Sequence, residues 1–121
     1  MKRPSYPELK RKIQKARETA LKNYISIVNP VSVATDALEL GFSVRDISNI
    51  LFDILKEIKP HDYAGQYPPQ HSYENSILES ELFAFKWDST QLGCKSYLKF
   101  ALKKNRLWLV SLHKDRKDKE D

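Results

Sequence analysis

The sequence has few of the features that mark secreted, membrane-spanning or nucleotide-binding proteins. It holds one cysteine, Cys94, so no internal disulfide is possible, and we expect a reducing, cytoplasmic location. No apolar run approaches the ~20 residues that a membrane span needs, and no apolar stretch follows the basic N-terminus as in a secretory signal. The GxGxxG, P-loop and GxSxG patterns are missing. The sequence therefore gives no sign of a secreted, membrane-spanning or nucleotide-binding protein.

Metal ligands at regular spacing are also missing. His61 and His71 lie ten residues apart without a cysteine or carboxylate at ligand spacing. We therefore expect no metal site and no cofactor.

Charge is unevenly distributed along the chain. Residues 1–22 hold eight Lys/Arg against two Glu, and residues 95–121 hold nine against four acidic residues. Residues 23–94 hold four basic and ten acidic residues. Basic ends could attract nucleic-acid phosphates or an acidic protein. Solvated helix faces and a frayed tail would produce the same pattern.

Apolar spacing of three and four residues predicts three helices in the first half of the chain. The first runs from Pro7 to about Val28 and stops at Asn29-Pro30. The second covers about 31–40, and Gly41 closes it. The third runs to about Ile58, with Ser43 as its cap and Asp46 in a near capping box.

Residues 59–80 have no sustained periodicity and predict a long loop. Loops of this length in compact domains are often functional, and aromatic or imidazole groups such as Tyr73 and His71 can stack on unpaired bases. Equally, the tyrosines and prolines could pin the loop across a sheet.

Alternation predicts three antiparallel strands after this loop. In residues 81–87, Leu82, Ala84 and Lys86 share one side, opposite Phe83, Phe85 and Trp87. The pattern of residues 95–114 predicts a β-hairpin. Helices followed by strands predict an α+β fold, with two or three N-terminal helices on one face of a small antiparallel sheet. We expect one domain over 1–114 and a charged, disordered tail over 115–121.

The hairpin can be registered in two ways. A three-residue loop at 103–105 joins Leu98, Phe100 and Leu102 on one face with four residues of the last strand: Arg106, Trp108, Val110 and Leu112. The opposite face then carries Lys95, Tyr97, Lys99, Leu109, Ser111 and His113. A two-residue loop at 104–105 slips the register and moves His113 to the apolar face. We prefer the first register because its apolar face is nearly unbroken.

Four short motifs occur in this order along residues 9–114: Leu40-Gly41-Phe42-Ser43-Val44-Arg45-Asp46, Asp62-Tyr63, Tyr97-Leu98-Lys99 and Val110-Ser111-Leu112-His113-Lys114. Their order and spacing resemble the MqsR-like ribonuclease toxins of bacterial toxin-antitoxin systems, within the RelE-like superfamily. The resemblance implies a small twisted sheet packed on helices and metal-free cleavage of RNA on the exposed sheet face. By this resemblance, Tyr97 corresponds to the tyrosine of the family's "YLK" motif, and His113 or Lys114 corresponds to the basic residue at the end of its last strand.

Two positions depart from the family pattern. The lysine that commonly follows the Asp-aromatic pair is replaced by Ala64 and Gly65, and the glutamine ahead of the "YLK" strand falls in a segment that reads Leu82-Phe83-Ala84-Phe85-Lys86. Lys86 or His71 are the candidate substitutes.

Cleaving RNA through its own 2′-hydroxyl requires a base, an acid and cations around the phosphate. An imidazole can take either proton-transfer role near neutral pH, which makes His113 the best candidate. Tyr97, Lys95 and Lys99 complete the predicted catalytic set. The predicted RNA contacts are Lys86, Arg106, Lys114, His71 and Tyr73.

Three functions follow from these observations. The first is an endoribonuclease toxin that cuts mRNA and is restrained by an antitoxin whose acidic segment covers the basic site. The second is a non-catalytic RNA- or DNA-binding module. The third is a protein-interaction or inhibitor domain that uses the acidic middle of the chain.

Overall fold

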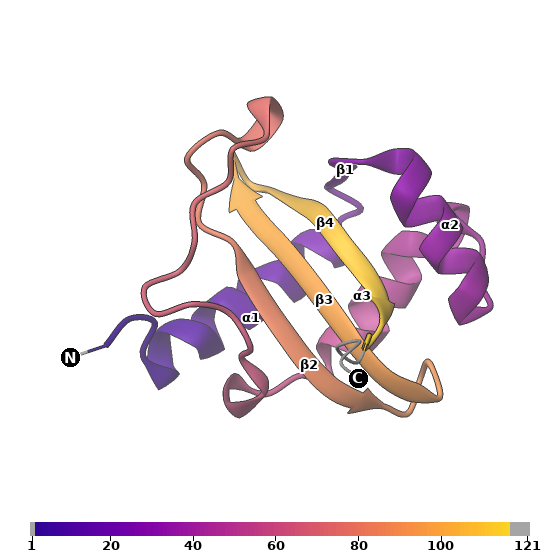
Figure 1. The fold of residues 1–121 in the computed structure, drawn as a ribbon, viewed down its shortest axis with the longest axis horizontal. Helices are drawn as coiled ribbons and strands as arrows, with labels where there is room; N and C mark the ends of the chain where they lie inside the picture. The colour runs from indigo at the N-terminus through magenta and orange to yellow at the C-terminus, as the bar shows by residue number, and fades with distance from the viewer. Residues whose placement is uncertain (1, 117–121) are drawn as a thin grey trace.

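A computed structural model describes residues 2–116. The main elements are α1 (Tyr6–Leu21), β1 (Ile25–Ile27), α2 (Pro30–Leu40), α3 (Ile47–Leu55), β2 (Phe83–Ser89), β3 (Cys94–Lys103) and β4 (Arg106–Lys114). Short 3-10 turns occur at η1 (Val44–Asp46), η2 (Pro60–Asp62) and η3 (Asn75–Ile77). The predicted α+β class is confirmed, with the helices preceding most of the sheet (Figure 1).

Helix α1 begins earlier and ends sooner than its apolar pattern predicts. The Ser5 side chain caps it by accepting a hydrogen bond from the Glu8 backbone N–H at 3.2 Å. The helix stops at Leu21, and Asn23 reverses the chain with a φ of 61°. The predicted continuation to Val28 is wrong because Ile25–Ile27 pair with the sheet as β1.

The ends of the next two helices agree only in part with the prediction. Gly41 ends α2 with a φ of 92°, a left-handed conformation that glycine adopts at little cost. Ser43 caps a 3-10 turn, η1, by accepting from the Arg45 N–H. The predicted capping box is wrong: Asp46 makes no side-chain cap bond, and α3 ends at Leu55 rather than near Ile58.

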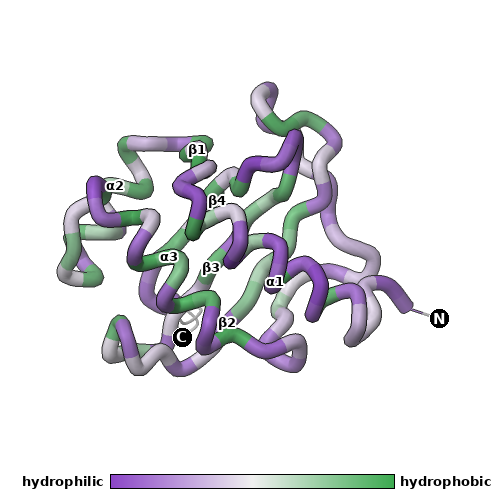
Figure 2. The backbone as a smooth tube through the Cα atoms, turned by 180° about the vertical axis from the view of Figure 1, so that it is seen from behind, coloured by the Kyte–Doolittle hydropathy of each residue, from purple (hydrophilic) through white to green (hydrophobic). Residues whose placement is uncertain are grey.

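The sheet has four strands in the order β1-β4-β3-β2. Strands β2, β3 and β4 form the predicted antiparallel meander, whereas β1 lies parallel to β4, so the sheet is mixed. Helices α1 and α3 lie behind this sheet, and α2 packs beside β4 (Figures 1 and 2). Within residues 2–116, no α-helix covers the other face of the sheet.

The β3–β4 register differs from the preferred prediction. Lys103 pairs with Arg106, so the loop has two residues, Lys104 and Asn105, with φ of 52° and 60°. Two left-handed residues are typical of the tight hairpin turn that suits twisted strands. Further along, Lys99 pairs with Ser111 but Phe100 pairs with Leu109, which leaves Val110 as the extra residue of a β-bulge.

The bulge decides which side chains face the helices. It returns His113 to the same sheet face as Tyr97, as predicted, and makes the two residues direct partners; an unbroken two-residue-loop register would have put them on opposite faces. Leu109, predicted on the open face, is instead fully buried in the helix-facing core with Phe100. Trp108 and Val110, predicted on the apolar face, pack against a second cluster with Ala101.

The main core lies between the sheet and the helices. The three phenylalanines on β2 and β3 are fully buried there, together with Leu51, Ile54 and Leu98. The predicted two-sided pattern of β2 is confirmed, since Phe83, Phe85 and Trp87 all join this core. Seen from behind, α1 is largely hydrophilic along its length, as a helix with one exposed side requires (Figure 2).

The long segment between α3 and β2 is held along the edge of the sheet. The Ala64 N–H donates to the Ala84 carbonyl at 2.8 Å, and Tyr63 forms a bridge with Phe85. Within η3, Ile77 is fully buried against Ala101 on the open sheet face. The predicted loop is therefore present, and its far end covers part of that face.

The predicted tail begins with residues that make contacts. The Asp115 N–H donates to the Lys95 carbonyl at 2.9 Å, and Arg116 forms an ion pair with Asp36 at 3.0 Å. The rest of that prediction, residues 117–121, lies outside the described residues. Across 2–116, none of the helices has the length and apolar character needed to cross a membrane.

Candidate functional site

Tyr97 and His113 meet on the face of the sheet that α1 and α3 leave open. They are register partners on β3 and β4, and their rings stack with centroids 5.0 Å apart and an angle of 21° between planes. Both side chains are half-buried, so one surface of the stack remains accessible to a ligand. Lys95 and Lys99 flank Tyr97 on the same strand face, because strand side chains alternate.

The tautomer of the neutral His113 ring follows from a hydrogen bond at its Nδ1. Its Nδ1 lies 2.6 Å from the carbonyl oxygen of Lys114. A carbonyl oxygen can only accept, so Nδ1 carries the hydrogen and donates. In the neutral ring, the lone pair is then on Nε2, which is the atom able to take a proton from a ligand.

Tyr97 is suited to a different role. Burial raises the pKa of its phenol above the ordinary value of 10.0. The group therefore stays protonated at neutral pH and offers an O–H donor rather than a phenolate.

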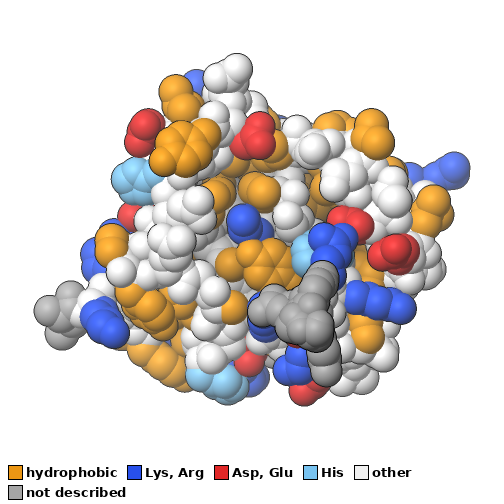
Figure 3. All heavy atoms as spheres, in the orientation of Figure 1, with side chains coloured by type: hydrophobic (Ala, Val, Ile, Leu, Met, Phe, Trp, Pro, Cys, Tyr) orange, Lys and Arg blue, Asp and Glu red, His pale blue; other side chains and the backbone are white. Residues whose placement is uncertain are grey.

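The neighbouring lysines differ in how freely their charge is available. Lys86 pairs across the sheet with Tyr97, and its Nζ lies 3.3 Å from Asp115. Lys95 lies 3.7 Å from Asp88. Lys99 has no carboxylate within ion-pair distance among residues 2–116. Viewed from the open face, basic side chains lie close to a hydrophobic and a histidine side chain near the centre (Figure 3).

Four predicted RNA contacts lie away from the Tyr97–His113 pair. Lys114 pairs with Ser96, so strand alternation turns it to the opposite face from His113. Arg106 stands at the other end of β4. His71 bridges to Glu81, about 17 Å along the strand direction from Lys86 at ~3.3 Å per residue. Tyr73, 85% exposed, belongs to the same outer segment.

Sequence reasoning missed a basic groove between α1 and the β3–β4 turn. It is lined by seven basic residues: Arg3, Arg11, Lys12, Lys15, Lys103, Lys104 and Arg106. The excess of positive charge at both ends of the chain was visible in the sequence, but its convergence depends on how α1 crosses the sheet.

Within the described part of the chain, no three His, Cys, Asp or Glu side chains are grouped as a metal site would require. The features of the open face are thus an imidazole, a phenol and amines.

Comparison with known proteins assigns no relative. No protein-family model matches the sequence, and no curated protein matches it. The resemblance to the MqsR-like toxins therefore stays a prediction carried by its four motifs.

Proposed function

We propose that the protein is a toxin-type, metal-independent endoribonuclease that cleaves mRNA in the cytoplasm. The observation that carries the proposal is the Tyr97–His113 stack on the open sheet face, with Lys99 beside it. These are the acid-base and cationic groups that cleavage through a 2′-hydroxyl needs. The motif resemblance points to the same residues.

In the proposed reaction, Nε2 of His113 accepts the proton of the 2′-hydroxyl as that oxygen attacks phosphorus. The bond from phosphorus to the 5′-oxygen breaks, and the neutral phenol of Tyr97 donates a proton to the leaving oxygen. Lys99 stabilises the negative charge on the phosphoryl oxygens. The products are a 2′,3′-cyclic phosphate and a 5′-hydroxyl.

A toxin of this kind requires a neutralising partner. We propose an antitoxin whose acidic segment covers the open face, where Lys86, Lys95 and Lys99 project. Opposite charges would speed association and exclude RNA from the same surface.

A non-catalytic RNA- or DNA-binding role is the second candidate. The basic groove favours it, because that groove carries positive charge without the imidazole and phenol that cleavage needs.

The test is incubation of purified protein with mixed single-stranded RNA in EDTA, beside the His113→Ala variant. Cleavage that persists in chelator, yields cyclic-phosphate ends and disappears in the variant supports the ribonuclease. Saturable binding without cleavage supports the binding module instead. If the protein neither cleaves nor binds RNA, both of these functions are contradicted and a protein-interaction role is favoured.

A further inference from the structure

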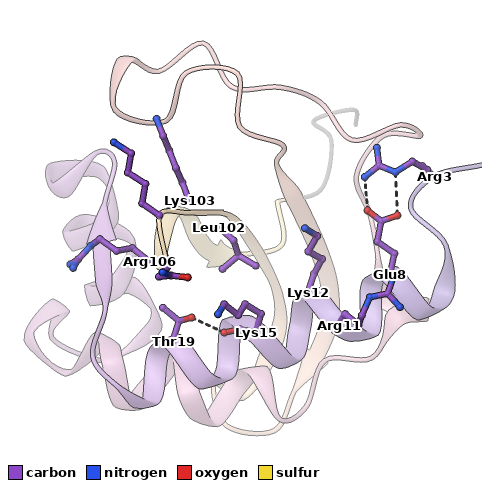
Figure 4. A pocket seen from close by; sticks show the side chains of 11 residues that line it. Arg3, Glu8, Arg11, Lys12, Lys15, Thr19, Leu102, Lys103 and Arg106 are labelled. Atoms are coloured by element: carbon purple, nitrogen blue, oxygen red, sulfur yellow. Dashed lines mark hydrogen bonds and ion pairs between the residues drawn. The ribbon is translucent and has the colours of Figure 1, made fainter.

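The basic groove forms where α1 passes the turn between β3 and β4. It has a volume of about 550 Å³. Arg11, Lys12 and Lys15 of α1 line one wall, and Lys103, Lys104 and Arg106 line the other. Figure 4 shows Lys12, Lys15 and Thr19 on α1, Leu102 facing them from β3, and the ends of Lys103 and Arg106 pointing away from the helix.

The groove's positive charge is not neutralised by carboxylates. Its one acid, Glu8, is already paired with Arg3, which also contacts Glu81 at 2.8 Å. None of the other six basic side chains lies within ion-pair distance of a carboxylate in the described chain. Like charges on facing walls repel one another, so the arrangement disfavours the folded state until an anion enters.

Three of these cations are positioned by neutral groups instead. Arg106 donates from Nε to the Ser26 hydroxyl at 2.9 Å and from Nη2 to the Ile25 carbonyl at 3.0 Å, which leaves Nη1 free. The Nζ of Lys103 donates to the Ser76 carbonyl at 3.2 Å. Lys12 lies 5.3 Å from the centre of the Phe83 ring. These contacts hold the ends of Lys103 and Arg106 on the sides of η3 and β1, away from α1, and both side chains keep their full charge because no carboxylate within residues 2–116 pairs with them.

We propose that this groove binds the phosphate backbone of a nucleic acid, at a site separate from the Tyr97–His113 pair. The cations are spread along two walls, as a chain of phosphates requires. Among the described residues that line the groove there is no aromatic side chain, and Leu102 is the one large apolar residue. These residues therefore offer neither a base-stacking platform nor the apolar anchors of a peptide site. Binding is therefore expected to be insensitive to base sequence.

The groove and the Tyr97–His113 pair lie at opposite ends of β3. Six residues separate Tyr97 from Lys103, about 20 Å at ~3.3 Å per residue, and Ile77 covers Ala101 between them. The groove can hold phosphates whether or not the open face cleaves RNA. Its use as a substrate-holding surface for the nuclease rests on the proposed function.

The test is a fluorescence-anisotropy titration with 2′-O-methyl oligouridine, which has no free 2′-hydroxyl and cannot be cleaved by the proposed reaction. The double variant Lys15→Gln, Lys104→Gln removes one exposed cation from each wall. Its matched control, Lys10→Gln with Lys59→Gln, removes the same charge from a surface outside the groove. Titrations are repeated over a series of salt concentrations.

The groove variant should bind the oligouridine roughly tenfold more weakly near physiological salt. The slope of its log association constant against log salt concentration should also be shallower by about 1.4, because each of the two lost phosphate contacts on a single strand contributes ~0.7. The control should match wild type in both. Equal losses in the two variants, or no loss in either, would overturn the site. Stronger binding of poly-glutamate than of the oligouridine would overturn the choice of ligand. Because the probe cannot be cleaved, these results are independent of whether His113 is catalytic.

Discussion

The carboxylate of Glu57 holds the β2–β3 turn, next to the end of the sheet where Tyr97 and His113 lie. Its Oε1 accepts from the Trp87 indole at 2.8 Å and the Ser89 hydroxyl at 2.7 Å, and its Oε2 accepts from the Gln91 backbone N–H at 2.8 Å. We predict that Glu57→Gln destabilises the protein. A glutamine can keep the two bonds at its oxygen, but its amide nitrogen presents a donor to the Gln91 N–H.

The size of this effect follows from the bonds that change. The variant loses one charge-assisted hydrogen bond and weakens two more, which costs about 2 kcal/mol in the free energy of unfolding. For a chain of 121 residues this lowers Tm by roughly 8 °C.

The loss should depend on pH. Burial opposes ionisation of Glu57, but the hydrogen bonds from Trp87, Ser89 and Gln91 outweigh it and lower the pKa of the folded carboxyl below the ordinary 4.5. The ionised group therefore stabilises the fold above pH 4.5, and this contribution is lost as the pH falls through the lower, folded-state pKa. Glutamine does not titrate, so the stability difference between the two proteins should shrink in that window.

Urea unfolding followed by tryptophan fluorescence, at neutral pH and at several acidic values, measures both effects. Glu39→Gln serves as a matched control because it makes the same change at an exposed carboxylate on α2. A Glu57→Gln variant as stable as wild type at pH 7, or a difference that grows on acidification, would refute the role given to this carboxylate.

Three further predictions test the hairpin and its open face. Ile77→Ala should lower the free energy of unfolding by about 2–4 kcal/mol, because Ile77 is fully buried against Ala101; an unchanged urea midpoint would contradict the packing of η3 on the sheet. Asn105→Ala should cost about 1 kcal/mol in the same assay, since residue 105 has a φ of 60°, and a more stable variant would argue against the two-residue turn. Tyr97→Phe keeps the ring stack but removes the phenolic proton, so RNA cleavage should fall about 100-fold with RNA binding unchanged; an unaffected rate would exclude the phenol as acid.

The sequence predicted the elements whose periodicity is strong and local. Gly41 and the two faces of β2 are clear because a single residue type or a strict alternation determines each. β1 was missed because Ile25 also fits the helical spacing of α1. Only the parallel pairing with β4, which is a tertiary contact, separates the two readings.

Two errors in the predicted β3–β4 hairpin cancel each other in their effect on which face His113 occupies. The turn has two residues, not three, and this alone would have turned His113 toward the core. The bulge at Val110 adds the missing residue and returns His113 to the face of Tyr97. Nothing in the residue pattern marks a bulge there, so its position required the structure.

The basic groove could not be predicted because its walls lie more than eighty residues apart in sequence. Charge counting identified the basic ends, but residues such as Lys15 and Lys104 meet only because α1 crosses behind the sheet toward the hairpin turn.

The central claim is that the Tyr97–His113 face cleaves RNA. Its most direct test is the single-turnover rate of RNA cleavage by His113→Ala, compared with His61→Ala, which removes an exposed imidazole from η2. We predict a loss of about 100-fold or more for His113→Ala, the range of general acid-base catalysis, and a wild-type rate for His61→Ala. Cleavage by the His113→Ala variant at the wild-type rate would contradict the account.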